Sequence, residues 1–126
     1  MHSGGPLTKI LDRNVTIVVF GFELKQIDEL NVADLGERLL QIAEQLPRPL
    51  LVLDMSSTEF FGSSFIEVLF RVWKRLTSKP GAHLGISAMQ PYCREVLHVT
   101  HLDTLWQIYD TYQAASDEFN KTISAG

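Results

Sequence analysis

Ser63 and Ser64 form a pair of hydroxyls at the point where a polar loop gives way to a long apolar stretch. The apolar stretch predicts a helix, so both hydroxyls lie at the positive end of a helix dipole, beside free backbone N–H groups. A phosphate is tolerated at such a place, and it adds about −1.5 to −2 charges to the surface. The pair therefore indicates a phosphorylation switch on a protein contact. The simpler alternative is helix capping by a serine side chain, which accounts for only one of the two.

The spacing of Ser64 and Glu67 predicts how this helix begins. In a capping box the serine oxygen accepts from the backbone N–H of Glu67, and the glutamate reaches back to the serine N–H. The helix is expected to run to about Lys79, where Pro80-Gly81 ends it.

Asp54 is a second candidate, because it ends the apolar run Leu50–Leu53. An α/β domain keeps functional carboxylates at the carboxyl ends of its strands. A receiver-type phosphoacceptor, however, also needs an acidic pair after the first long strand and a lysine after a later one. Gly21-Phe22 and Ser87-Ala88 stand there instead. Asp54 is therefore more typical of a turn or cap residue.

Enzyme and metal motifs are not met by the sequence. The segment Gly62–Phe65 lacks the second glycine of a G-x-S-x-G nucleophile elbow. His98 and His101 are three residues apart, but no acidic or cysteine ligand follows in register. No G-K-[ST] phosphate loop occurs. We therefore predict no catalytic residue, no metal ligand and no cofactor, and a protein that is not an enzyme.

The elements that position the serines follow from the hydrophobic pattern. An unbroken apolar run at 50–53 predicts a strand that is covered on both faces. Strands at 7–11 and 15–20 are expected to form an antiparallel hairpin through Asp12–Asn14. Further strands are predicted at 82–87 and 105–109, and helices at 32–45, 64–78, 91–99 and 111–123. This order predicts an α/β fold with a mixed, mostly parallel sheet of about five strands and about four helices.

The second of these helices carries more apolar side chains than one sheet can cover. It is therefore expected to pack between the sheet and a neighbouring element, or else to turn part of its surface to a partner.

Composition limits the class of protein. The chain has 126 residues, 45% hydrophobic and 21% charged, as is typical of one globular domain. A net charge of −4 argues against binding of nucleic acid. The single cysteine, Cys93, fits a reducing compartment. Residues 1–6 are expected to be a flexible N-terminus too polar for a signal peptide, and no apolar run could span a bilayer. We therefore expect a cytoplasmic protein without direct membrane contact.

Three stretches give the sequence a family resemblance. The segments Leu53–Ser56 and Phe60–Ser64, followed by apolar Ile66 and Val68-Leu69, resemble the central motif of STAS domains. That motif is a strand ending in L-D-L-S, a hydrophobic pair, D-S-S/A-G and an apolar helix. The stretches 92–103 and 105–110 resemble the family's third helix and last strand. The resemblance implies a single STAS domain over residues 7–123.

STAS domains include bacterial anti-sigma factor antagonists, and the resemblance implies that function here. The expected partners are an anti-sigma factor serine kinase, which phosphorylates a serine at the start of the second helix, and a phosphatase that reverses the change. A homodimer is a further possibility. By position the phosphoacceptor is Ser63, with Ser64 as the alternative. The implied partner-binding residues are Asp54, Ser56, Phe60, Phe61, Gly62, Ser64 and Phe65.

Two residues depart from the family pattern. Gly62 replaces the usual aspartate before the serine, and Phe65 replaces the glycine after the pair. Loss of the aspartate removes a charge beside the acceptor, and the large Phe65 is expected to change the shape of the surface. These departures favour an alternative function, a phosphorylation-independent STAS interaction module in a larger signalling assembly. A small-ligand or nucleotide-binding domain is a third hypothesis, although no pocket motif supports it.

Overall fold

A computed structural model describes residues 6–125, so the predicted flexible N-terminus lies, except for Pro6, outside the described residues. The strands are β1 (Leu7–Asp12), β2 (Val15–Phe20), β3 (Gln26–Ile27), β4 (Leu50–Asp54), β5 (Phe60–Phe61), β6 (His83–Ser87) and β7 (Gln107–Tyr109). The α-helices are α1 (Val32–Glu44), α2 (Ser63–Thr77), α3 (Pro91–Val99) and α4 (Tyr112–Ala125). Two 3₁₀ turns complete the set, η1 (Phe22–Leu24) and η2 (Leu102–Thr104).

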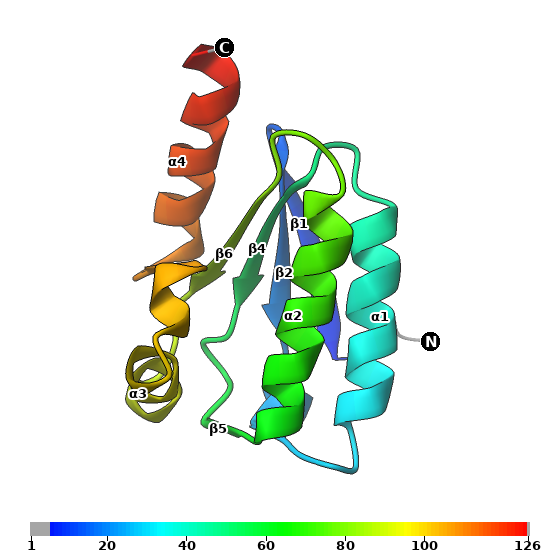
Figure 1. Cartoon of the computed structure of the whole chain (residues 1–126), viewed down its shortest axis with the longest axis vertical. Coiled ribbons are helices and arrows are strands. Elements are labelled where there is room, and N and C mark those ends of the chain that lie inside the picture. Colours follow the sequence, from blue (N-terminus) through cyan, green and yellow to red (C-terminus); the bar gives the residue numbers. More distant parts are fainter. Residues whose placement is uncertain (1–5, 126) are drawn as a thin grey trace.

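The central sheet has five strands in the order β1-β2-β4-β6-β7. β1 and β2 form the expected antiparallel hairpin, and the remaining neighbours are parallel. The sequence prediction of a mixed, mostly parallel sheet with four α-helices is therefore confirmed. Figure 1 shows α1 and α2 side by side in front of the sheet and α4 apart from them.

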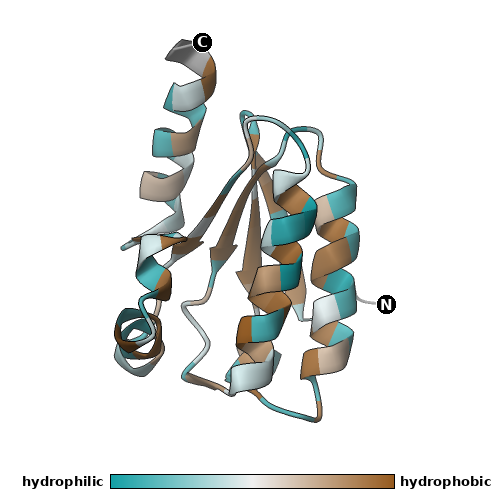
Figure 2. Ribbon diagram, in the orientation of Figure 1, coloured by the Kyte–Doolittle hydropathy of each residue, from teal (hydrophilic) through white to brown (hydrophobic). Residues whose placement is uncertain are grey.

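Strand β4 is covered on both faces, because all five of its residues are buried. Leu51 and Leu53 belong to the core under α1 and α2. Leu50 and Val52 belong to a second core against Ala115 and Phe119 of α4. Figure 2 shows the central strands coloured hydrophobic along most of their length, while α1 and α2 alternate between hydrophobic and hydrophilic residues.

The apolar side chains of α2 that the sheet alone could not cover pack against other parts of the fold. Phe70 and Trp73 pack against the main core, and their rings lie 5.1 Å and 6.2 Å from the ring of the fully buried Trp106. On the other side, a Cβ on Gly36 of α1 would stand 3.1 Å from a methyl group of Val68, so the two helices pack closely there. Packing within the fold, the first of the two expected explanations, accounts for these residues.

The strands differ from the sequence prediction in two places. β3 and β5 pair as a second, two-stranded parallel sheet, where a loop was expected. The last strand begins at Gln107, and not at Leu105, because the N–H groups of Leu105 and Trp106 both bond to the carbonyl of Leu102 in a tight turn. This turn directs the Trp106 side chain into the core. Across residues 6–125, none of the helices has the length and apolar character needed to cross a membrane.

Candidate functional site

Ser63 is the first residue of α2, and its side chain is exposed. Gly62 precedes it in an extended conformation (φ −90°, ψ 176°) and occupies the N-cap position. The Gly62 carbonyl accepts the first helical bond, from Phe65 N–H at 3.0 Å. The hydroxyl of Ser63 therefore stands at the positive end of a fifteen-residue helix.

The predicted capping box is wrong. The N-cap is Gly62, which has no side chain to cap the helix, so Ser64 already lies within the first turn. Ser64 is half-buried and Glu67 is exposed. A residue with helical backbone angles cannot return its oxygen to the N–H three residues on, because capping requires the extended conformation that Gly62 adopts. Neither serine is thus committed to capping.

The two-stranded sheet holds the loop before Ser63 in place. Gln26 is paired with Phe60 and Ile27 with Phe61, and the Gly62 N–H donates to the Ile27 carbonyl at 3.1 Å. Successive residues of a strand point to opposite sides. Phe60 is accordingly 40% exposed, while Phe61 is buried.

Phe60 forms part of an exposed aromatic pair. Its ring stacks on that of Tyr92, the second residue of α3, with centroids 5.5 Å apart and an interplanar angle of 25°. The Tyr92 side chain is 51% exposed. Two neighbouring α-helices, α2 and α3, thus begin on either side of one aromatic platform.

The platform continues into the segment before β3. The Lys25 carbonyl accepts from Glu59 and Phe60, at 2.8 Å and 3.3 Å, and the Lys25 ammonium lies 3.9 Å from the Glu59 carboxylate. That ammonium is also 5.6 Å from the ring centre of Phe22, which is 74% exposed. We refer to Phe22, Lys25, Glu59, Phe60, Ser63 and Tyr92 together as the Ser63 surface.

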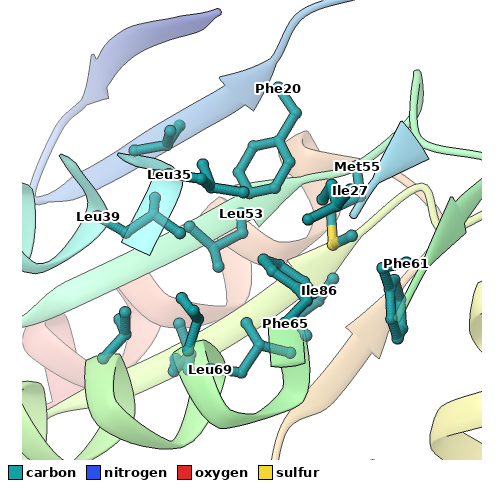
Figure 3. Close-up of a cluster of buried hydrophobic side chains, with 14 of the residues drawn as sticks. Phe20, Ile27, Leu35, Leu39, Leu53, Met55, Phe61, Phe65, Leu69 and Ile86 are labelled. Atoms are coloured by element: carbon teal, nitrogen blue, oxygen red, sulfur yellow. The ribbon is translucent and has the colours of Figure 1, made fainter. Parts of the chain in front are cut away.

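Phe61 and Phe65 were expected to contact a partner, but both side chains lie in the core. Their rings are 5.2 Å apart, and Phe65 also meets the ring of Phe20 edge-on at 6.1 Å. Figure 3 shows both in the cluster of buried side chains next to α2. The expectation that Phe65 reshapes the surface is therefore wrong, because its position in the first turn of α2 faces the sheet.

Asp54 is also buried, with 4% of its surface exposed. One carboxylate oxygen accepts from the N–H and the hydroxyl of Ser56, at 3.2 Å and 2.8 Å, and the other accepts from the Ser87 hydroxyl at 2.9 Å. Ser56 itself is exposed. Its carbonyl accepts from the Gln90 side chain at 2.8 Å. Asp54 thus fixes the loop after β4 to β6, and the Ser56 carbonyl fixes the same loop to the start of α3.

Sequence reasoning missed Phe22, Lys25 and Tyr92, which complete the surface. Phe22 and Lys25 come from one segment and Tyr92 from another, and the pairing of β3 with β5 and the aromatic stack bring both segments to Phe60. The sequence contains one usable signal for Tyr92. Pro91 is typical of the first turn of a helix, so the next residue, Tyr92, is an aromatic side chain at the start of α3, near the ends of other strands. For residues 6–125 the structure brings together no group of three side chains able to hold a metal ion.

The chain is similar to known proteins in sequence and in fold. The family model for the STAS domain matches residues 10–115. The chain is 34% identical to an anti-sigma-factor antagonist (STAS) domain protein from Planctomyces limnophilus, covering 90% of this chain and 97% of that one, with a TM-score of 0.83. For an anti-sigma factor antagonist from Mycobacterium paratuberculosis the identity is 25%, the coverage 90% and 92%, and the TM-score 0.77.

The phosphorylated form of the Bacillus cell fate determinant SpoIIAA is a more distant match. Its identity is 16%, with 89% of this chain and 97% of that chain covered and a TM-score of 0.65. At that identity the likeness shows a shared fold alone.

Proposed function

Since the chain belongs to the STAS domain family, we propose that it is an anti-sigma factor antagonist whose Ser63 surface binds an anti-sigma factor serine kinase. Phosphorylation of Ser63 weakens that contact, and a phosphatase restores it. The protein then acts by binding and not by catalysis, in the cytoplasm. The two proteins that are 34% and 25% identical to this chain are both anti-sigma factor antagonists, which supports this choice among STAS functions.

One observation carries the proposal: Ser63 is an exposed hydroxyl at the start of α2 beside an exposed aromatic pair. Exposure gives a kinase access to the hydroxyl. Aromatic side chains supply much of the binding energy in protein interfaces. A dianion placed at the edge of such a platform must be desolvated when a partner binds, so phosphorylation weakens an apolar contact.

The surroundings of Gly62 and the open start of α2 support a phosphate on Ser63. Nothing lies within 4 Å of the place where a Cβ on Gly62 would stand. The helix has no side-chain cap, so its terminal N–H groups are open to a phosphate on Ser63. The modification therefore changes the charge of the surface without requiring the domain to refold. SpoIIAA, which shares the fold, is known in a phosphorylated form.

Intact mass and phosphate mapping of protein purified from its own host test the switch. A single phosphate on Ser63 is expected, and Ser64 is the alternative acceptor. Binding to an anti-sigma kinase encoded in the same genome is then compared for Ser63→Asp, Ser64→Asp and the wild type. We expect Ser63→Asp to weaken binding about tenfold or more.

Ser78→Asp is the matched control, because Ser78 is an exposed serine at the opposite end of the same helix. It is expected to bind as the wild type does. Unchanged binding by Ser63→Asp, together with a protein that carries no phosphate under growth and stress conditions, would refute the switch.

A second function is favoured by the composition of the same surface. Position 62 has no carboxylate, and the platform is mainly aromatic, so it can bind a partner without any phosphate. The protein is then a phosphorylation-independent interaction module in a larger signalling assembly. A Tyr92→Ala change that abolishes partner binding while Ser63→Asp leaves it intact would select this function.

A further inference from the structure

Strand β1 forms one edge of the central sheet. It pairs with β2 along its length, from Leu7 with Phe20 to Asp12 with Val15. In the strand order of residues 6–125, nothing pairs with its other side. The backbone N–H and C=O groups on that side are available to a further strand.

A groove follows this edge, between β1 and helix α1. One hollow of about 210 Å³ lies at the Leu11 end of the strand, and one of about 270 Å³ at the Leu7 end. The two hollows share Lys9 of β1 with Ile42 and Gln45 of α1, so they lie next to each other along the strand. An edge strand facing a helix across a groove is the arrangement in which extended peptides add to a sheet.

The groove is lined by apolar side chains at one end and also contains two basic side chains. At one end, Leu11 is 62% exposed and lines the hollow together with Leu46 and Pro47. Beside it stands Lys9, an exposed cation for which residues 6–125 provide no ion-pair partner. The other cation of the groove, Arg38, is already bonded to Asp34 at 2.8 Å. An occupant thus meets an apolar hollow next to one unneutralised positive charge.

We propose that this groove binds an extended segment of a partner protein, which adds to β1 as a sixth strand of the central sheet. Lys9 and Leu11 are two residues apart in one strand, so their side chains lie on the same side of the sheet. Residues opposite each other in paired strands also share a side. The segment therefore carries an acidic residue opposite Lys9 and, two positions away, an apolar residue that enters the hollow at Leu11.

The Leu11 end of this groove, where the apolar residue of the segment is to bind, is distant from the Ser63 surface. The Leu11 end of the groove lies by Thr16 and Pro47, at the amino ends of the parallel strands. Ser63 follows β5 and lies near the opposite, carboxyl ends. Binding at the Leu11 end of the groove therefore does not depend on whether Ser63 acts as a switch.

Selection from a library of random twelve-residue peptides displayed on phage, with the full chain as bait, tests the proposal. Selected peptides are expected to share an Asp or Glu two residues from a Leu, Ile, Val or Phe. Synthetic copies are then titrated against variants by fluorescence polarisation. Because Leu11→Gln removes the apolar contact and Lys9→Glu reverses the charge, each is expected to weaken binding about tenfold. Both side chains are exposed, so both variants should keep the thermal midpoint of the wild type.

A charge swap makes the test specific. A peptide whose acidic residue is changed to lysine should bind Lys9→Glu better than the wild type. Lys121→Glu, at an exposed lysine on α4, is the control and should bind as the wild type does. Slower hydrogen exchange of the amides in residues 7–12 on peptide binding is also expected. The proposal is overturned if no peptide is selected, if peptides bind all variants equally, or if the chain dimerises through β1 and Leu11→Gln abolishes the dimer.

Discussion

At the scale of single residues, Asp54 organises the candidate site without belonging to its surface. Its carboxylate accepts three hydrogen bonds, two from Ser56 and one from the fully buried Ser87. Replacement by alanine leaves the Ser87 hydroxyl without an acceptor in the interior. We expect Asp54→Ala to lower the free energy of unfolding by about 1–3 kcal/mol, measured by urea denaturation. Asp34→Ala, which breaks an exposed ion pair with Arg38, should cost less than about 1 kcal/mol. Equal losses in the two variants would show that the Asp54 bonds are not buried in solution.

Gly62 allows a second residue-scale prediction. Its extended backbone and the open space around it suit an aspartate, whose carboxylate can accept from the free N–H groups of α2. We expect Gly62→Asp to raise the free energy of unfolding by about 0.3–1 kcal/mol, through capping and the helix dipole. Gly62→Ala, which adds a side chain without an acceptor, should not. If the two variants are equally stable, the N-terminus of α2 is capped in some other way.

The sequence predicted some of these residues and not others, for a physical reason. A serine at the start of an apolar stretch has a local signature, so the position of Ser63 was predictable. The bond between Ser87 and Asp54 joins residues 33 positions apart and leaves no local pattern. The inward direction of Phe61 depends on its pairing with Ile27, and a strand of two residues is too short to show an alternating pattern in the sequence.

At the scale of elements, α4 packs on the sheet through a glycine. A Cβ on Gly85 of β6 would stand 2.9 Å from Phe119 of α4 and 3.3 Å from Tyr109 of β7. Because the ring of Phe119 is buried between helix and sheet, it cannot move aside freely. We expect Gly85→Ala to cost about 1–3 kcal/mol of unfolding free energy, measured by thermal and urea denaturation. A smaller residue at the helix position should relieve the clash, so Phe119→Leu should cost less in the Gly85→Ala background than in the wild type. Additive losses would contradict this packing.

The sequence predicted correctly those helices and strands that bury an apolar face. β2, β4, α1 and α2 are long enough to show their apolar pattern, and each was predicted within about two residues of its observed bounds. β3 and β5 are each only two residues long and are formed by tertiary pairing. The start of β7 was displaced because Trp106, a residue with high strand propensity, fills the core from a turn.

At the scale of the whole molecule, parallel strands follow from the alternation of strands and helices, and the family resemblance follows from the motif around Asp54 and Ser63. Neither requires knowledge of individual contacts. The Ser63 surface and the β1 groove do require it, because each is assembled from segments distant in the sequence. The fold was therefore more predictable than the surfaces by which it acts.

Because the Cys93 thiol is buried, the free energy of unfolding of the domain depends on pH in the alkaline range. Burial raises the pKa of Cys93 from its ordinary value of 9.0 to about 11. Burial, with a contribution from Glu118, also raises the pKa of Tyr109. Both groups are neutral when protonated, so the folded state keeps their protons to higher pH than the unfolded state does. Below about pH 9 the Cys93 thiol is protonated in both states and has no effect on the pH dependence. Between about pH 9 and 11 unfolding releases its proton, and stability falls as the pH rises.

Urea denaturation at a series of pH values isolates the part due to the thiol. The free energy of unfolding of the wild type is expected to fall more steeply above about pH 9 than that of Cys93→Ala. In the variant the pH dependence comes only from Tyr109 and from the other titrating groups that both proteins share. The slopes are compared, and not the absolute values, because the substitution also leaves a small cavity. In the same pH range the native thiol should react slowly with a disulfide reagent, and quickly once urea unfolds the chain, because the thiolate is the reactive form. Parallel slopes with a rapidly reacting native thiol would mean that the region between Cys93 and the Thr58 carbonyl, 3.7 Å away, opens to water in the folded protein.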